Sequence, residues 1–254
     1  MPRVGTVTTV SGVQDGVIGD LAPAGVLRAA INLGNPVLAQ GPAAAPEGVT
    51  VDIARELGAR LAVPVELACF DAARKSFEAM VRGRADICFL AIEPARAAEV
   101  AFTAPYVVIE GVFAVPEDSG LTSPAEVDRE HVRIGVNQGS AYDLFLSRTL
   151  RHATVVRGED GISVFRQQGL DAVAGIRQSV SDFVARNPGF RMIDERFMQI
   201  RQALGTTRTR APGTVRFLAA AIEELKASGF IRDALRRSGQ DPAIVAPPGD
   251  ERPW

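Results

Sequence analysis

The sequence has few of the features that mark a membrane-spanning or nucleic-acid-binding protein. Its longest apolar runs fall far short of the roughly 20 residues that a transmembrane helix needs. The 28 basic and 30 acidic residues give a formal net charge of −2. No basic tract and no alternation of arginine with aromatic residues is present, which makes nucleic acid a poor candidate partner. We therefore expect no membrane span and no nucleic-acid ligand.

Cysteine and histidine are also scarce. Cys69 and Cys88 stand next to apolar residues in expected strands, so we expect buried free thiols, with a disulfide between them as the alternative. Together with the two scattered histidines, His131 and His152, they form no metal-binding pattern. The sequence contains no Gly-rich phosphate loop and no Ser/His/Asp or Cys/His arrangement for hydrolysis. We therefore expect no cofactor and no bound metal.

The first residues do not resemble an export signal. Residues 1–20 contain one basic residue, Arg3, and no continuous apolar core. If Met1 is the native start, the expected location is the cytoplasm. If Met1 was added to a trimmed chain, a periplasmic location is the alternative. Ordered structure is expected to begin near Leu27, which makes residues 1–26 an N-terminal extension.

The rest of the chain is typical of an α/β protein. With 254 residues, 46% hydrophobic and 23% charged, it is long enough for one large or two medium cores. Short apolar runs alternate with segments of helical periodicity. Strands are predicted at 27–31, 63–67, 86–90, 107–115, 131–136, 153–156, 170–176, 190–193 and 198–206. Helices are predicted at 49–61, 76–82, 123–127, 143–150, 162–168, 214–227 and 230–238.

The stretch from Ala85 to Tyr106 is the most informative part of the sequence. Residues 86–90 suit a buried strand, and Pro94 to Arg96 form the first turn of a helix directly after it. Free N–H groups at such a turn and the helix dipole favour an anion. The Arg96 guanidinium can bind a carboxylate or phosphate through two parallel hydrogen bonds. The alternative is a surface cap or an ion pair with a nearby glutamate.

Three motifs in this region carry a family resemblance. The motifs are Gly83-Arg84-Ala85-Asp86, Pro94-Ala95-Arg96 and Phe102-Thr103-Ala104-Pro105-Tyr106. In the order and spacing of these motifs, the chain resembles the amino-acid class (family 3) of bacterial solute-binding proteins, the receptors that feed ABC transporters. The resemblance extends from about Leu27 to about Gln240.

The resemblance implies a two-lobed periplasmic-binding-protein-like fold, each lobe a mixed sheet flanked by helices. Residues 27–110 and 203–254 would form lobe 1, and residues 111–202 would form lobe 2. Two crossing strands would join the lobes as a hinge. The Pro- and Gly-rich segment from about residue 241 is expected to be a mobile tail of lobe 1.

The resemblance also implies ligand-binding residues. In the family, the arginine at the Arg96 place binds the α-carboxylate of the ligand, and a turn in lobe 2 holds the other side of the same carboxylate. Gly139 and Ser140 match that turn, and Ser140 occupies a Ser/Thr place of the pattern. Ala141 and Tyr142 depart from the pattern, and Tyr142 either stacks on the ligand or packs against its own helix.

One departure bears on the ligand. Family members carry an aspartate at the end of a lobe 2 strand for the ligand ammonium, and Ile176 stands at that place. An unpaired ammonium in a closed cleft costs on the order of several kcal/mol, so a standard α-amino acid is not expected. Arg177 next to it offers a cation for a second anionic or carbonyl group, or faces the surface. Glu110, within an apolar run, either forms a structural ion pair or contacts the ligand.

The remaining candidate ligand residues are less specific. Asn32 and Asn35 occupy places where the family has an acidic and an aromatic residue, and they either contact a polar ligand or serve only as turn formers. Lys75 either reaches space left by a missing aromatic or is solvated at a helix start. Three further residues complete the candidate ligand-binding set: Phe89, Ala91 and Gln202.

We therefore expect a protein that binds a small carboxylate-bearing solute, amino-acid-like or another organic acid, in an interlobe cleft that closes by hinge motion. An ABC transporter permease is the partner that the resemblance implies, together with a periplasmic location. A receptor is favoured over an enzyme. The alternatives are a lyase similar to cyclohexadienyl dehydratases, with Glu110 or Lys75 as general acid or base, and a cytoplasmic ligand sensor.

Overall fold

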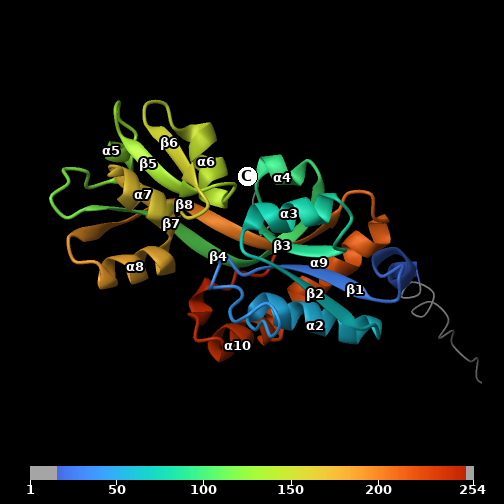
Figure 1. The fold of residues 1–254 in the computed structure, drawn as a ribbon. Helices are drawn as coiled ribbons and strands as arrows, with labels where there is room; N and C mark the ends of the chain where they lie inside the picture. The colour runs from blue at the N-terminus through green and yellow to red at the C-terminus, as the bar shows by residue number, and fades with distance from the viewer. Residues whose placement is uncertain (1–15, 250–254) are drawn as a thin grey trace, which may run out of the picture. The chain divides into compact units, whose positions relative to one another are not determined.

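The computed structural model describes residues 16–249 and has the expected α/β fold (Figure 1). One eight-stranded mixed sheet has the strand order β2-β1-β3-β8-β4-β7-β5-β6. The described chain divides into two compact units. Unit 1 contains the residues up to Leu90, Arg96–Tyr106 and the residues from Ala203 onward, and unit 2 contains Ala91–Ala95 and Val107–Gln202. The long strands β4 (Val100–Pro116) and β8 (Phe190–Thr207) contribute to both.

Unit 1 is built on parallel strands. Strand β1 pairs with β2 from Leu27 opposite Val65 onward, and on its other side Ala29 lies opposite Ile87 of β3. The strands and helices of unit 1 are β1 (Leu27–Asn32), α2 (Val49–Leu61), β2 (Val65–Phe70), α3 (Ala73–Val81), most of β3 (Ile87–Ala91), α9 (Pro212–Ala227), α10 (Phe230–Arg237) and the 3-10 turn η1 (Pro242–Ile244). The short helix α4 (Pro94–Ala97) has its first two residues in unit 2 and its last two in unit 1.

Unit 2 contains both parallel and antiparallel strand pairs. Strand β5 pairs in parallel with both β6 and β7, and β4 runs antiparallel to β7 with Gly111 opposite Ile176. The other elements of unit 2 are α5 (Pro124–Val127), β5 (Arg133–Asn137), α6 (Ala141–Thr149), β6 (Thr154–Gly158), α7 (Gly161–Gln168), β7 (Ala172–Ile176) and α8 (Arg177–Arg186).

Each unit has its own apolar core. In unit 1, Met80 of α3 packs with Cys88 and Leu90 of β3 and with Val100 of β4. In unit 2 the core gathers residues of β4, β7, α7 and α8, including the fully buried Phe165. Burying one such side chain stabilises the fold by about 2 kcal/mol. All five residues of β3 are buried, as its apolar run predicts.

Two expectations about the chain ends are corrected. Ordered structure begins before Leu27, because residues 16–21 are helical and Val17 and Leu21 are buried. The segment expected to be a mobile tail makes specific contacts, since the N–H of Ala246 donates to the carbonyl of Tyr106 at 3.0 Å. Residues 1–15 and 250–254 lie outside the described part of the chain.

Two elements differ from the predicted ones. Helix α8 was predicted only as the exit from a strand, because its N-cap is Ile176 and no side chain caps it. The two strands predicted at 190–193 and 198–206 are one strand, β8, which continues through the exposed polar residues 194–196. Among the described residues, no helix has both the length and the apolar character that a bilayer crossing requires.

Candidate functional site

Arg96 is the third residue of the four-residue helix α4 and is almost completely buried, with 2% of its surface exposed. It lies within electrostatic reach of Cys88 in β3. Burial raises the pKa of the Cys88 thiol to about 12, and the positive charge of Arg96 acts in the opposite direction. This burial excludes the alternative of a surface cap at Arg96.

Phe89 lies in the core of unit 1. Its ring is 1% exposed and meets the ring of Tyr106 edge to face, with 6.1 Å between centroids and an interplanar angle of 87°. Burial, and next the neighbouring Cys88, raise the pKa of Tyr106. The Tyr106 hydroxyl has no hydrogen-bond partner among residues 16–249. Phe89 thus helps to hold the strand that precedes Arg96.

The other unit 1 candidates make local contacts. The side-chain oxygen of Asn32 accepts from Gly34 N at 3.0 Å, and that of Asn35 accepts from Val37 N at 3.2 Å, so both form the short turns that Asn favours. Lys75 forms an ion pair with Asp71 at 2.7 Å on the surface. These contacts agree with the structural alternative for each residue, and they leave the amide N–H groups of both asparagines as possible ligand donors.

The Ser140 turn in unit 2 is a well-formed helix start. Ser140 is the N-cap of α6, and its Oγ accepts from Asp143 N at 3.1 Å. Asp143 in turn accepts from Gly139 N at 2.8 Å. This reciprocal arrangement is closely related to a capping box. The Gly139 N–H is therefore used by a carboxylate of the protein, and the Ser140 hydroxyl interacts with both Asp143 N and the Tyr142 hydroxyl.

Asp143 is 3% exposed and is held by charge-assisted hydrogen bonds. Arg157 Nε lies 3.0 Å from its Oδ1, and Ser147 Oγ donates to the same oxygen at 3.0 Å. Neither Asp143 nor Arg157 is among the ligand-binding residues predicted from the sequence. The Ser-x-x-Asp spacing of Ser140 and Asp143 is the signal that would have found the first.

The next two residues of the turn face inward. Ala141 is 7% exposed and Tyr142 is 8% exposed. Burial raises the pKa of the Tyr142 hydroxyl, against the effect of its hydrogen bond with Ser140. Tyr142 therefore has most of its surface packed within unit 2, and its hydroxyl lies at the Ser140 turn.

Glu110 forms an ion pair with two arginines. Arg177 Nε lies 2.7 Å from Glu110 Oε2, and Arg196 Nη1 lies 3.1 Å from Oε1. Arg177 also donates to the carbonyl of Asp194 at 2.6 Å. Burial acts to raise the pKa of Glu110, but the hydrogen bonds and charges of the two arginines outweigh it and leave this pKa below its usual value.

A second buried carboxylate lies beside Arg96 in sequence. Glu93 is 4% exposed and pairs with Arg148 of α6 at 2.7 Å. Ile92 N donates to the carbonyl of Arg201 at 2.9 Å. Two further candidates, Ala91 and Gln202, are buried at 3% and 6% exposure. The residues between β3 and α4 are thus attached to α6 and β8 within unit 2.

Within each unit the candidates form small groups. The structure brings together Gly139, Ser140 and Tyr142, and it pairs Glu110 with Arg177. Three arginines that neutralise carboxylates, Arg148, Arg157 and Arg196, were not predicted from the sequence, because no local pattern links each of them to its partner. Residues 16–249 contain no group of three or more His, Cys, Asp or Glu side chains that could hold a metal ion.

Comparisons with known proteins give a family and a fold. The model of the bacterial extracellular solute-binding proteins, family 3, matches residues 27–239. A search of curated protein sequences finds no match. Searches of solved structures find many similar chains, of which three are described below.

The three structures share the fold at low sequence identity. The substrate-binding protein AbpA from Streptococcus pneumoniae, an amino acid ABC transporter protein bound to L-arginine, has a TM-score of 0.71 and 17% identity, covering 89% of this chain and 99% of its own. A putative ABC transporter binding component from Wolinella succinogenes, complexed with lysine, has a TM-score of 0.70 and 17% identity, covering 84% of this chain and 95% of its own. The ancestral amino acid-binding protein AncCDT-1, a precursor of cyclohexadienyl dehydratase, has a TM-score of 0.70 and 17% identity, covering 87% of this chain and 98% of its own.

Proposed function

Because the chain belongs to family 3 of the bacterial extracellular solute-binding proteins, we propose that its solute is a small organic acid whose carboxylate is bound by Arg96. The family and the fold make it a solute-binding protein of the amino-acid ABC transporter type. A guanidinium matches a carboxylate through two parallel hydrogen bonds. In this proposal the Ser140 hydroxyl and the first N–H groups of α6 are further donors to the same ligand.

The observation that carries the proposal is the neutralisation of the carboxylates near the unit 2 candidates. Three of them are paired with arginine: Glu93 with Arg148, Glu110 with Arg177 and Arg196, and Asp143 with Arg157. A fourth, Asp160, caps α7 by accepting from Ile162 N and Ser163 N. A ligand ammonium would have to displace one of these partners, and breaking the ion pair of a buried carboxylate such as Glu93 or Asp143 costs about 2 kcal/mol. A solute without an α-ammonium avoids that cost.

Ile176 also argues against a ligand with an α-ammonium. It ends β7, lies opposite Gly111 of β4 and is 8% exposed. Its side chain offers no hydrogen-bond acceptor to an ammonium, and Arg177 directly after it already donates to Glu110. An organic acid with an uncharged body therefore fits these residues better than a standard α-amino acid does.

Arginine and lysine are the competing ligand class, because two of the similar structures contain them. The test compares matched pairs that differ only in the α-ammonium, by thermal unfolding and then calorimetry. Suitable pairs are L-lysine with 6-aminohexanoate, L-arginine with 5-guanidinopentanoate, and L-phenylalanine with 3-phenylpropionate. Ligands that bind the folded state raise the midpoint of thermal unfolding. Tighter binding of an acid than of its amino acid supports the proposal, and tighter binding of the amino acids overturns it.

We further propose that one ligand engages residues of both units and that β4 and β8 bend as it binds, so that binding energy drives closure. Small-angle scattering with and without the acid found in the panel tests this step. A smaller radius of gyration with ligand is expected. An unchanged radius at saturating ligand contradicts closure and leaves the choice of ligand class untouched.

The lyase alternative receives little support from the residues that it requires. A general acid at neutral pH needs a raised carboxyl pKa, whereas the arginines hold the pKa of Glu110 below its usual value. Lys75 is paired with Asp71 at the surface, outside the low-dielectric setting that activates a lysine. The receptor function is therefore the one that we propose.

A further inference from the structure

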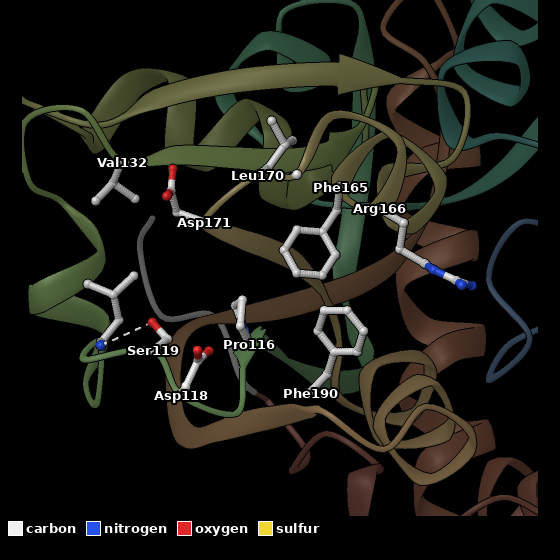
Figure 2. Close-up of a pocket in the computed structure, with 11 residues that line it drawn as sticks. Pro116, Asp118, Ser119, Val132, Phe165, Arg166, Leu170, Asp171 and Phe190 are labelled. Atoms are coloured by element: carbon white, nitrogen blue, oxygen red, sulfur yellow. Dashed lines mark hydrogen bonds between the residues drawn. The ribbon is translucent and has the colours of Figure 1, made fainter.

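The two ends of strand β5 differ in the groups that surround them. At the amino end, the pocket drawn in Figure 2 is backed by Phe165, Leu170 and Phe190, whose side chains already pack in the core of unit 2. At the carboxyl end, the chain turns through Ser140 into α6. The Ser140 turn is held by polar contacts, in contrast to the apolar packing at the other end of the strand.

Backbone and amide groups hold both sides of this turn. Gln138 N donates to the carbonyl of Gly158 at 2.8 Å, and Ser140 N donates to the carbonyl of Asn137 at 3.1 Å. The side-chain oxygen of Asn137 accepts from Gly161 N at 2.8 Å. These bonds attach the turn to the end of β6 and to the start of α7.

The protein places a negative charge of its own at the same helix start. Asp143 lies in the first turn of α6, is 3% exposed, and accepts from Gly139 N at 2.8 Å. A solute carboxylate bound by the first N–H groups of α6 would therefore lie near the Asp143 carboxylate. Two like charges away from water repel each other, so an anion can bind here only when the charge of Asp143 is compensated.

Arg157 supplies the compensating charge. It lies in β6 opposite Val136 of β5, and its Nε is 3.0 Å and 3.1 Å from the two carboxylate oxygens of Asp143. Its Nη2 donates to Ser147 Oγ at 2.6 Å, and Ser147 Oγ donates to Asp143 Oδ1 at 3.0 Å. The three side chains form a closed set of charge-assisted hydrogen bonds, and the ion pair within it has no net charge.

We propose that Arg157 is a positioning residue for the solute carboxylate. It keeps the Asp143 carboxylate on Gly139 N, which fixes the Ser140 turn, and it cancels the negative charge that would repel the solute. Arg157 itself does not contact the solute in this arrangement. The inference rests on the proposed function, because it takes the start of α6 as part of the solute site.

The first test measures affinity by calorimetry, with 3-phenylpropionate, 6-aminohexanoate and 5-guanidinopentanoate as probes. Arg157→Gln should weaken binding of the acid about tenfold, because it leaves the charge of Asp143 uncompensated. Arg157→Lys keeps the positive charge and should retain part of the affinity. Arg157→Gln combined with Asp143→Asn should bind more tightly than Arg157→Gln alone, because the repelling charge is gone.

A matched control removes an arginine elsewhere in unit 2. Arg186→Gln breaks an exposed pair with Asp182 on α8 and should leave the affinity unchanged. Near-ultraviolet circular dichroism shows whether each variant is folded. Wild-type affinity of a folded Arg157→Gln protein overturns the proposal. A double variant that binds no more tightly than Arg157→Gln also overturns it, since a purely structural role of Arg157 predicts no such recovery.

The second test needs no solute and separates this inference from the proposed function. In the protein without solute, the amide of Gly139 should exchange its hydrogen faster in Arg157→Gln than in the wild type, because its acceptor is no longer held. The amides of Ile162 and Ser163, which Asp160 caps, should exchange as in the wild type. Unchanged exchange at Gly139 overturns the positioning role whether or not an acid binds. Faster exchange at Gly139 supports that role, and failure of all three acids to bind the wild type then counts against the proposed function alone.

Discussion

Arg148 and Glu93, 55 residues apart in the chain, form an ion pair in which Arg148 Nη1 lies 2.7 Å from Glu93 Oε2. The Glu93 side chain is 5% exposed and that of Arg148 is 43% exposed. Arg148 also lies over the ring of Phe145, 5.4 Å from its centroid. The pair attaches the segment between β3 and α4 to α6 and neutralises a carboxylate three residues before Arg96.

Replacing Arg148 by alanine should destabilise the protein by about 2 kcal/mol. The change leaves the buried Glu93 carboxylate without its cation, and an uncompensated buried charge is costly even when its lost partner was partly exposed. Urea unfolding followed by circular dichroism measures the loss.

Two further variants separate this effect from a general loss of arginine. Arg129→Ala removes an arginine from an exposed pair with Glu126 and should leave the unfolding curve unchanged. Arg148→Ala combined with Glu93→Gln should recover part of the lost stability, because no unpaired charge remains. Wild-type stability of the single Arg148→Ala variant would show that the pair contributes nothing.

Asp20 caps helix α9, whose N-cap residue Ala211 lies 191 residues later in the chain. Its Oδ2 accepts from Ala211 N at 2.9 Å and from Thr214 Oγ1 at 2.6 Å, and α9 has no cap of its own. Asp20→Ala should therefore cost about 1–2 kcal/mol of unfolding free energy. Asp241→Ala removes a comparable bond, to Ala243 N, from the short turn η1, which buries no residue, and should change stability little. Equal effects of the two variants would contradict the role of Asp20.

The sequence is sufficient to predict elements whose ends carry local signals. Helix α2 was predicted at 49–61, where the structure has it, because its apolar residues recur at helical spacing. Helix α8 does have apolar residues at helical spacing, Val180, Phe183 and Val184, but its start carries no signal, because Ile176 cannot cap it and its first turn, from Arg177 to Ser179, is polar. The contact of Ala246 with Tyr106 could not be predicted, because Pro- and Gly-rich composition says nothing about a distant partner.

The candidate ligand-binding residues also include features that local sequence predicts and contacts that only the fold creates. The position of Arg96 after a buried strand and the cap role of Ser140 follow from local sequence. Whether Glu110 binds a ligand or a structural cation depends on Arg196, which is 86 residues away and becomes a neighbour only through the folding of β8 beside β4. The ion pairs that argue against an ammonium ligand therefore come from the structure.

The pairing of Glu110 with Arg177 and Arg196 should make stability depend on pH. Because the pKa of Glu110 is lower in the folded state than in the unfolded state, its contribution is fully present above the unfolded value of about 4.3 and is lost as the pH falls through the folded pKa. The difference in unfolding free energy between the wild type and Glu110→Gln should be constant above pH ~5 and shrink below pH ~4. A difference that stays constant into strong acid would contradict this ion pair.

The two cysteines should differ in reactivity. Both are free thiols; Cys88 is fully buried and Cys69 only partly. Burial raises the pKa of Cys88 to about 12, so almost no thiolate exists at neutral pH. A thiol reagent should label one cysteine slowly in the native protein and both in urea, with the native label found on Cys69 by mass spectrometry. Native labelling of Cys88, or absence of labelling in urea without reductant, would contradict the structure.

Arg96→Ala should abolish binding of the organic acid identified by the ligand panel while the fold stays intact, because the carboxylate loses its two-fold donor. Loss of a buried charge partner corresponds to roughly a 100-fold or larger fall in affinity. Arg96→Lys keeps the positive charge but lacks the planar guanidinium, so its affinity for the acid should lie between those of the wild type and of Arg96→Ala. Arg177→Ala should bind nearly as the wild type does, because Arg177 is held by Glu110. Near-ultraviolet circular dichroism confirms that each variant is folded, and undiminished affinity of a folded Arg96→Ala protein would refute the role of Arg96.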